Sequence, residues 1–177
     1  FSIFGITVLF PVLLLLAIMI KMEDGGPVFY RGVRAGKNGK LFKIFKFRTM
    51  VVNAEKIGGS STADGDPRIT KIGKFIRKHK LDELPQFINV LKGEMSFVGP
   101  RPEVQHYVNM YTDEEKIILS VKPGITDWAS LWNSDEGSIL AGSPDPEKTY
   151  LEKIRPEKIR LQLHYVKKHS LGVDVKI

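Results

Sequence analysis

Residues 76–102 contain the side chains of this sequence that are best suited to chemistry. Asp82 and Glu83 are adjacent carboxylates, and Arg101 follows them between two prolines in Gly-Pro-Arg-Pro. The basic run 77–80 stands immediately before the carboxylate pair. Carboxylates bind hard divalent cations, and arginine binds phosphate oxygens through two parallel hydrogen bonds. With a divalent metal, these residue types together make a good place for a phosphate group.

The carboxylate pair is expected at the beginning of a short helix. Apolar residues recur at helical spacing from Leu84 to Leu91, and Gly93 can end the helix in a left-handed conformation. Asp82 would then cap the first turn, where the helix dipole favours both carboxylates as anions. An N-cap aspartate followed by a first-turn glutamate is also an ordinary structural pattern, so the spacing alone leaves a purely structural role open.

The first residues of the chain predict a membrane segment. Residues 1–20 carry no charge, and 14 of them are Leu, Ile, Val or Phe. Their transfer into lipid is favourable by roughly 4–8 kcal/mol, more than the approximately 3 kcal/mol that Pro11 costs inside a helix. We therefore expect this segment to enter the bilayer.

The same segment is compatible with two geometries. Twenty helical residues extend about 30 Å, which is enough to cross the hydrocarbon core. Pro11 removes the hydrogen bond to the carbonyl of Thr7, and a sharp break there would return the segment to the face it entered. Phe10 precedes the proline, so the Thr7 hydroxyl is the candidate for satisfying the freed backbone. The residues alone leave both geometries open.

Residues 23–177 are expected to form one α+β domain. Val28–Val33 and Leu41–Met50 have strand character and are separated by a loop with an Asn-Gly pair, which predicts a β-hairpin. Lys46 and Arg48 lie on the second strand. They belong either to a solvated strand face or to the site around the carboxylates.

Helices are predicted on both sides of the carboxylate pair. Ile69–Lys78 and Pro156–Ser170 are basic amphipathic stretches, which either lie in the headgroup region of a membrane or pack inside the domain. Lys158 falls on the polar side of the second stretch. Thr112 and Glu115 form a predicted capping box that opens a further helix.

The charge of the chain limits its partners. Lysine and arginine number 27 against 20 acids, which gives a formal net charge of +7. Such a protein attracts nucleic acid, anionic lipids or phosphorylated substrates. Nucleic-acid binders interleave aromatic and basic residues on one platform, and no such platform is evident here, so we expect no nucleic-acid partner.

Several motifs of the chain occur together and in a recognisable order. They are residues 43–50 (KIFKFRTM), 80–86 (KLDELPQ), 89–102 (NVLKGEMSFVGPRP), 122–126 (KPGIT) and 174–177 (DVKI). In this order they resemble the bacterial sugar transferases that are monotopic phosphoglycosyl transferases. The resemblance covers almost the whole chain. The segment Asp127–Gly142 departs from the family pattern, and it is a candidate for contact with the sugar or the base of a substrate.

The resemblance implies both an architecture and a reaction. Residues 1–22 would form a re-entrant membrane helix, and residues 23–177 a catalytic domain on the cytoplasmic face of the bacterial inner membrane, built from the hairpin and interfacial amphipathic helices. The enzyme would transfer a sugar-1-phosphate from a UDP-sugar to polyprenyl (undecaprenyl) phosphate and release UMP, as the first membrane step of polysaccharide or glycoconjugate synthesis. Membrane lipids would be further partners, and a homodimer is compatible with the family.

The resemblance also implies roles for individual residues. Asp82 would attack phosphorus and form an aspartyl-phosphosugar intermediate, with Glu83 as the second catalytic residue and both carboxylates holding Mg²⁺. The expected substrate- and phosphate-binding residues are Lys46, Arg48, Arg77, Arg101 and Asp174. The alternative is a basic membrane scaffold, or a module that binds an anionic ligand without catalysis.

Overall fold

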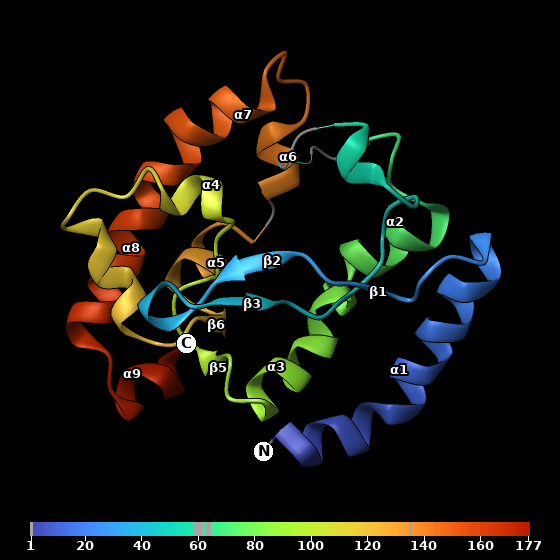
Figure 1. Cartoon of the computed structure of the whole chain (residues 1–177), viewed down its shortest axis with the longest axis horizontal. Coiled ribbons are helices and arrows are strands. Elements are labelled where there is room, and N and C mark those ends of the chain that lie inside the picture. The colour runs from blue at the N-terminus through green and yellow to red at the C-terminus, as the bar shows by residue number, and fades with distance from the viewer. Residues whose placement is uncertain (1, 59–61, 63–64, 135) are drawn as a thin grey trace.

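The computed structural model describes residues 2–58, 62, 65–134 and 136–177, so that Phe1 of the predicted membrane segment lies outside the described residues. It is a mixed helix and sheet structure (Figure 1), as expected from the sequence. The strands are β1 (Phe29–Tyr30), β2 (Val33–Ala35), β3 (Leu41–Lys43), β4 (Lys46–Phe47), β5 (Ser96–Val98) and β6 (Gly124–Thr126). The α-helices are α1 (Ser2–Asp24), α2 (Lys71–Lys78), α3 (Phe87–Leu91), α4 (Gln105–Val108), α5 (Trp128–Trp132), α6 (Glu136–Leu140), α7 (Pro146–Thr149), α8 (Arg155–Lys168) and α9 (Leu171–Lys176). The other short helices are η1 (Lys37–Gly39), η2 (Ala54–Lys56), η3 (Leu81–Gln86), η4 (Glu115–Ser120) and η5 (Tyr150–Ile154).

Helix α1 is the apolar segment that the sequence predicts. By length and composition, it is long and apolar enough to cross a membrane. Pro11 lies inside the helix, which continues through it and is drawn in Figure 1 as one bent helix. The Thr7 hydroxyl donates to the carbonyl of Ile3 at 2.9 Å. It therefore does not satisfy the Thr7 carbonyl that Pro11 leaves free.

Helix α1 packs against the rest of the molecule near both of its ends. One core cluster consists of the buried residues Leu16, Ile20, Phe47 and Ile76. At the other end, Gly5 lies so close to Phe87 that a Cβ atom there would be 2.8 Å from the ring. The side of α1 turned away from the domain carries exposed apolar residues, among them Phe4, Phe10 and Leu15. An apolar surface is thus held along one side of the domain.

The predicted hairpin forms, but as two short antiparallel pairs. Strand β2 pairs with β3, and β1 pairs with β4. Asn38 adopts a positive φ of 55° in the connecting turn, a conformation that asparagine and glycine tolerate best. The break between β3 and β4 interrupts the alternation of buried and exposed side chains. Phe42 and Ile44 are buried two positions apart, but the next buried apolar residue, Phe47, follows three positions later.

The predicted helices form with different surroundings. Thr70 caps α2 by accepting a hydrogen bond from the Gly73 N–H at 2.9 Å. The capping box at Thr112 and Glu115 is confirmed, and it opens the 3₁₀ helix η4. The prediction that Lys158 lies on the polar side of its helix was wrong, because α8 packs one face against the domain and Lys158 is buried on that face.

Strands β5 and β6 are parallel neighbours, although 25 residues separate their bounds. Parallel strands end at the same edge of a sheet. The close approach of the two chains requires glycine, since a Cβ on Gly124 would lie 2.1 Å from the backbone nitrogen of Gly99. The residues just after the strands, Arg101 and Asp127, are thereby brought together.

Candidate active site

The carboxylate pair lies in the first turn of the 3₁₀ helix η3, between α2 and α3. The prediction that Asp82 caps this helix was wrong. The residue before the helix is Lys80, which has a left-handed φ of 54°, and no side chain caps the turn. The short connection from α2 leaves no extended residue for an N-cap, so the Asp82 carboxylate is not used by the backbone of its own helix.

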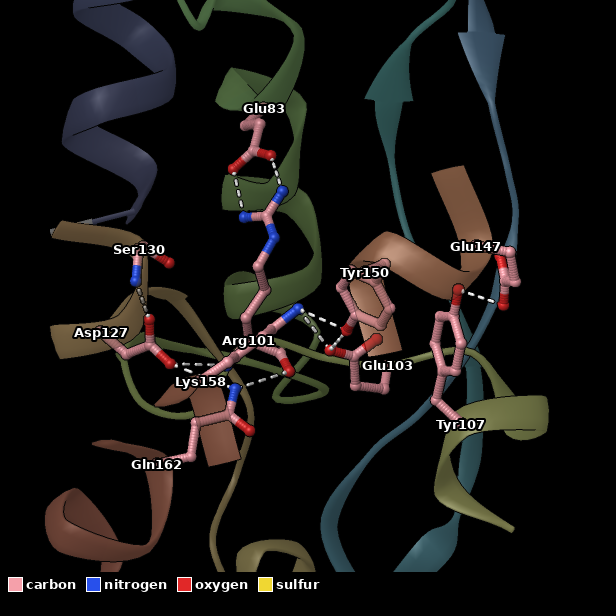
Figure 2. Close-up of polar contacts among 10 residues, drawn as sticks. All are labelled: Glu83, Arg101, Glu103, Tyr107, Asp127, Ser130, Glu147, Tyr150, Lys158 and Gln162. Atoms are coloured by element: carbon pink, nitrogen blue, oxygen red, sulfur yellow. Dashed lines mark hydrogen bonds and ion pairs between the residues drawn. The ribbon is translucent and has the colours of Figure 1, made fainter. Parts of the chain in front are cut away.

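Two basic residues that are distant in sequence meet Glu83. Arg101 binds it with both terminal nitrogens, Nη1 reaching Oε2 at 3.0 Å and Nη2 contacting Oε1. Lys46 Nζ lies 2.8 Å from Glu83 Oε1 and 4.0 Å from Asp82 Oδ2. Figure 2 shows the Arg101 side chain extending from its loop to Glu83. The structure therefore joins Asp82, Glu83, Lys46 and Arg101 in one cluster.

The two carboxylates of this cluster differ in their electrostatics. Burial works to raise the pKa of Glu83, but Arg101 and Lys46 outweigh it and hold that pKa well below its usual value. Burial raises the pKa of Asp82, and the opposing effect of Lys46 does not cancel it. Among the described residues, none donates a hydrogen bond to Asp82. Glu83 is a fixed anion, whereas Asp82 is a carboxylate with free oxygens.

A large cleft opens in front of the cluster. Its volume is about 1370 Å³, and its lining includes Asp82, Glu83, Lys46 and Arg101. Further lining residues come from the segment that departs from the family pattern and from the helices after it, and they include Ser130, Trp132, Asn133, Tyr150 and Lys158. The cleft is therefore lined both by residues of the predicted site and by residues from the C-terminal half of the chain.

The remaining predicted site residues lie at different distances from the cluster. Arg77 lines the same cleft, and its charge favours the ionised form of Asp82. Arg48 also borders the cleft, but its guanidinium forms an ion pair with Asp24 at the end of α1. Asp174 accepts a hydrogen bond from the Tyr165 hydroxyl at 2.8 Å, and it is not among the described residues that line the cleft.

Asn89 is a positioning residue that sequence reasoning missed. It is fully buried, and its Oδ1 accepts a hydrogen bond from the Phe45 N–H at 2.8 Å. Its Nδ2 donates to the carbonyl of Lys43 at 3.0 Å and to Glu94 at 2.7 Å. Asn89 thus ties α3 to the strands that carry Lys46. Asparagine is an unfavourable residue inside a helix, and this was the available signal.

A second charged group, which lines the same cleft, was also missed. Lys158 forms an ion pair with Glu103 at 2.5 Å, and its Nζ donates to the Tyr150 hydroxyl at 3.2 Å. Burial alone would lower the pKa of Lys158, but Glu103 outweighs it and raises that pKa. Figure 2 shows this group beside the loop that carries Arg101. Glu103 follows the Pro-Arg-Pro motif directly, so the loop is held by an ion pair on this side.

The donor set at the cluster fits Mg²⁺. In the part of the chain that the structure describes, no group of three or more His, Cys, Asp or Glu side chains is placed to hold a metal ion. Magnesium is usually held by one or two carboxylates together with substrate phosphates and water. Asp82 offers free oxygens, and Glu83 lies beside it with both oxygens engaged by Arg101 and Lys46. The residues present match this mode of binding, with Asp82 as the main protein ligand.

The apolar helix α1 and the cluster of Asp82, Glu83, Lys46 and Arg101 are compatible with a membrane-associated protein that binds phosphate groups. The chain belongs to the bacterial sugar transferase family, whose model matches residues 1–177.

Individual relatives are similar over nearly the whole chain. A UDP-N-acetylgalactosamine-undecaprenyl-phosphate N-acetylgalactosaminephosphotransferase of Aeromonas hydrophila is 38% identical over 99% of this chain. A UDP-glucose:undecaprenyl-phosphate glucose-1-phosphate transferase of Escherichia coli is 42% identical over 94% of it. The chain spans 39% and 34% of the lengths of these two relatives. The exopolysaccharide production protein ExoY of Sinorhizobium fredii is 33% identical, and the chain spans 77% of it.

Proposed function

We propose that this chain transfers a sugar-1-phosphate from a UDP-sugar to undecaprenyl phosphate, with release of UMP. The names of its relatives support a sugar nucleotide as donor and a polyprenyl phosphate as acceptor. The observation that carries the proposal is the state of Asp82, a largely buried carboxylate with free oxygens next to a glutamate that is already neutralised. Such a group suits nucleophilic attack more than structural support.

In the first step, an oxygen of Asp82 attacks the phosphorus atom that bears the sugar. A bond forms between this oxygen and phosphorus, and the bond from phosphorus to the bridging oxygen of the diphosphate breaks. UMP leaves with the electron pair of that bond. Lys46 and Arg101 lie where they neutralise the charge that develops on the phosphate oxygens, and Glu83 keeps both cations in place.

In the second step, a phosphate oxygen of the lipid attacks the same phosphorus atom. The bond to Asp82 breaks, the carboxylate is regenerated, and a polyprenyl diphosphate sugar is formed. Asp82, with Glu83 beside it, would hold Mg²⁺ together with the substrate phosphates, and the ion would supply charge neutralisation for the diphosphate. Removal of divalent cations with EDTA is expected to stop UMP release, and addition of Mg²⁺ is expected to restore it. Full activity in EDTA would contradict the proposed role of Mg²⁺.

A direct assay tests the proposed reaction. Membranes containing the chain, UDP-sugar, undecaprenyl phosphate and Mg²⁺ are expected to release UMP, with one sugar preferred in a panel of UDP-sugars. The donor alone, without lipid, should leave a phosphosugar adduct on the protein, visible as a mass increase. A membrane scaffold without catalysis would give neither product. UMP release without any adduct would favour direct attack by the lipid phosphate.

The pH dependence of adduct formation follows from the state of Asp82. Attack needs the ionised carboxylate, and burial raises the pKa of Asp82 above its usual 3.8. The rate of adduct formation is therefore expected to fall as the pH drops through a value above 3.8. Measuring this step without lipid removes the titration of the acceptor phosphate from the profile. A rate that stays constant down to pH 4 would contradict the assignment of Asp82 as the nucleophile.

We further propose that α1 is re-entrant and that the catalytic domain faces the cytoplasm at the bacterial inner membrane. The packing of α1 against Phe87 near one end and Phe47 near the other supports a helix that stays beside its domain. The chain has no cysteine, so Phe4→Cys and Met22→Cys each create a unique label at an exposed site. In inside-out vesicles, an impermeant maleimide is expected to label both variants. Labelling of Met22→Cys alone would indicate a spanning helix.

A further inference from the structure

Asp127 is a fully buried acid that the proposed chemistry does not use. It follows β6 and caps α5, where its Oδ1 accepts a hydrogen bond from the Ser130 N–H at 2.7 Å. Its other oxygen, Oδ2, accepts from the backbone N–H of Arg101 at 3.1 Å and from the Gln162 side-chain amide at 3.3 Å. Figure 2 shows Asp127 and Gln162 at the backbone of Arg101, on the side opposite to Glu103.

We propose that Asp127 is a positioning residue of the transfer reaction: its carboxylate fixes the backbone of Arg101, so that the guanidinium stays on Glu83 and faces the cleft. This inference rests on the proposed function. It assigns a role to a residue in the segment where the chain departs from its family pattern. Asp127 thereby connects α5 to the loop that carries Arg101, and residues of both line the cleft.

The geometry explains why a carboxylate is needed at this position. Three donors converge on Asp127, and only a carboxylate offers both of its oxygens as acceptors. Burial of a carboxylate is unfavourable unless it is hydrogen-bonded. We therefore infer that Asp127 has a function in addition to capping α5. Arg101 must extend from its loop to reach Glu83, and a displacement of about 1 Å at a reacting centre lowers rates by about 100-fold.

The isosteric variant Asp127→Asn isolates this contact. Asparagine also caps helices, so the bond to Ser130 is retained. The Oε1 atom of Gln162 has no partner among the described residues and can accept from the new amide after rotation of the Gln162 side chain. The Arg101 N–H then loses its acceptor, and the Arg101 carbonyl loses the hydrogen bond from Gln162 Nε2 at 3.5 Å, so both losses fall on the backbone of Arg101. Asp145→Asn is the matched control, because Asp145 caps α7 on the surface through the Lys148 N–H at 3.0 Å.

A double-mutant cycle in the full chain separates positioning from simple structural support. Asp127→Asn is expected to lower kcat by about 10–100-fold with a similar melting temperature, while Asp145→Asn keeps the wild-type kcat. In an Arg101→Lys background, which has no guanidinium to place, Asp127→Asn should change kcat by less than about 3-fold. An equal loss in both backgrounds, or wild-type kcat for Asp127→Asn, would overturn the proposal.

A second measurement does not depend on turnover. The Nε–H signal of Arg101 in an NMR spectrum can be identified by its loss in Arg101→Lys. It is expected to shift or broaden in Asp127→Asn and to stay unchanged in Asp145→Asn. An unchanged signal in Asp127→Asn would refute the positioning role. If the wild-type chain shows no transfer, the proposed function fails, and the NMR comparison still decides whether Asp127 holds Arg101.

Discussion

Asp82→Asn is expected to lower the rate of transfer by at least about 1000-fold, because the substitution removes the atom that forms the covalent bond to phosphorus. The effect on folding should be small. Asp82 receives no hydrogen bond from a described residue, and its ionisation is opposed by burial, so a neutral amide of the same shape relieves an electrostatic cost. The variant should bind membranes like the wild type and show no phosphosugar adduct by mass spectrometry.

The control for this experiment is an aspartate with no role in the cleft. Asp113 is almost fully exposed and forms a surface ion pair with Lys116 at 2.8 Å. Surface ion pairs contribute little to stability, so Asp113→Asn should keep both the wild-type rate and the adduct. Substantial transfer by Asp82→Asn, or an adduct on this variant, would show that another group accepts the phosphosugar.

Arg101→Ala is expected to have the second largest effect, because it acts on stability and activity together. Glu83 would keep only Lys46 as a direct partner in a largely buried position. Removing one member of a buried ion pair costs about 3–5 kcal/mol, and the cost here should be nearer 2–3 kcal/mol because the Arg101 side chain is 32% exposed. Turnover should also fall, because the guanidinium group that is proposed to bind phosphate oxygens is lost. Denaturant unfolding and UMP release measure the two effects separately.

A double variant distinguishes the two causes. In Arg101→Ala with Glu83→Gln, the buried charge that lost its partner is neutral, so part of the lost stability should return. Activity should not return, because neither the guanidinium nor the carboxylate is present. Recovery of activity along with stability would mean that Arg101 serves only the fold. An unchanged melting temperature in Arg101→Ala would mean that the pair with Glu83 contributes nothing to stability.

Much of the local structure follows from short-range pattern. The Asn-Gly turn predicts the hairpin, and Asn38 takes the expected positive φ. The capping box at Thr112 forms, and Gly93 has the left-handed φ predicted for the residue that ends a helix. These features depend on residues within four positions of one another, and backbone preferences and local hydrogen bonds are sufficient to specify them.

Other predictions were wrong, or stay untested, where distant parts of the chain decide the outcome. Asp82 does not cap its helix, because α2 leads into it through the left-handed residue Lys80. The helical pattern places Lys158 on the polar face of its helix, yet the side chain is buried, because it forms an ion pair with Glu103. Arg48 was expected around the substrate phosphates, and the structure places its guanidinium on Asp24 of α1. Its role toward phosphate stays a prediction.

The sequence by itself determined the apolar segment at residues 1–20, the family and the presence of the adjacent carboxylates, since these depend on composition and on contiguous motifs. Only the tertiary structure decided that Glu83 is neutralised by Arg101 and Lys46 while Asp82 keeps free oxygens. It alone placed Asp127 at the backbone of Arg101. The reason is physical: burial and the distances between charges set the state of a carboxylate, and both arise only when segments far apart in the chain pack together.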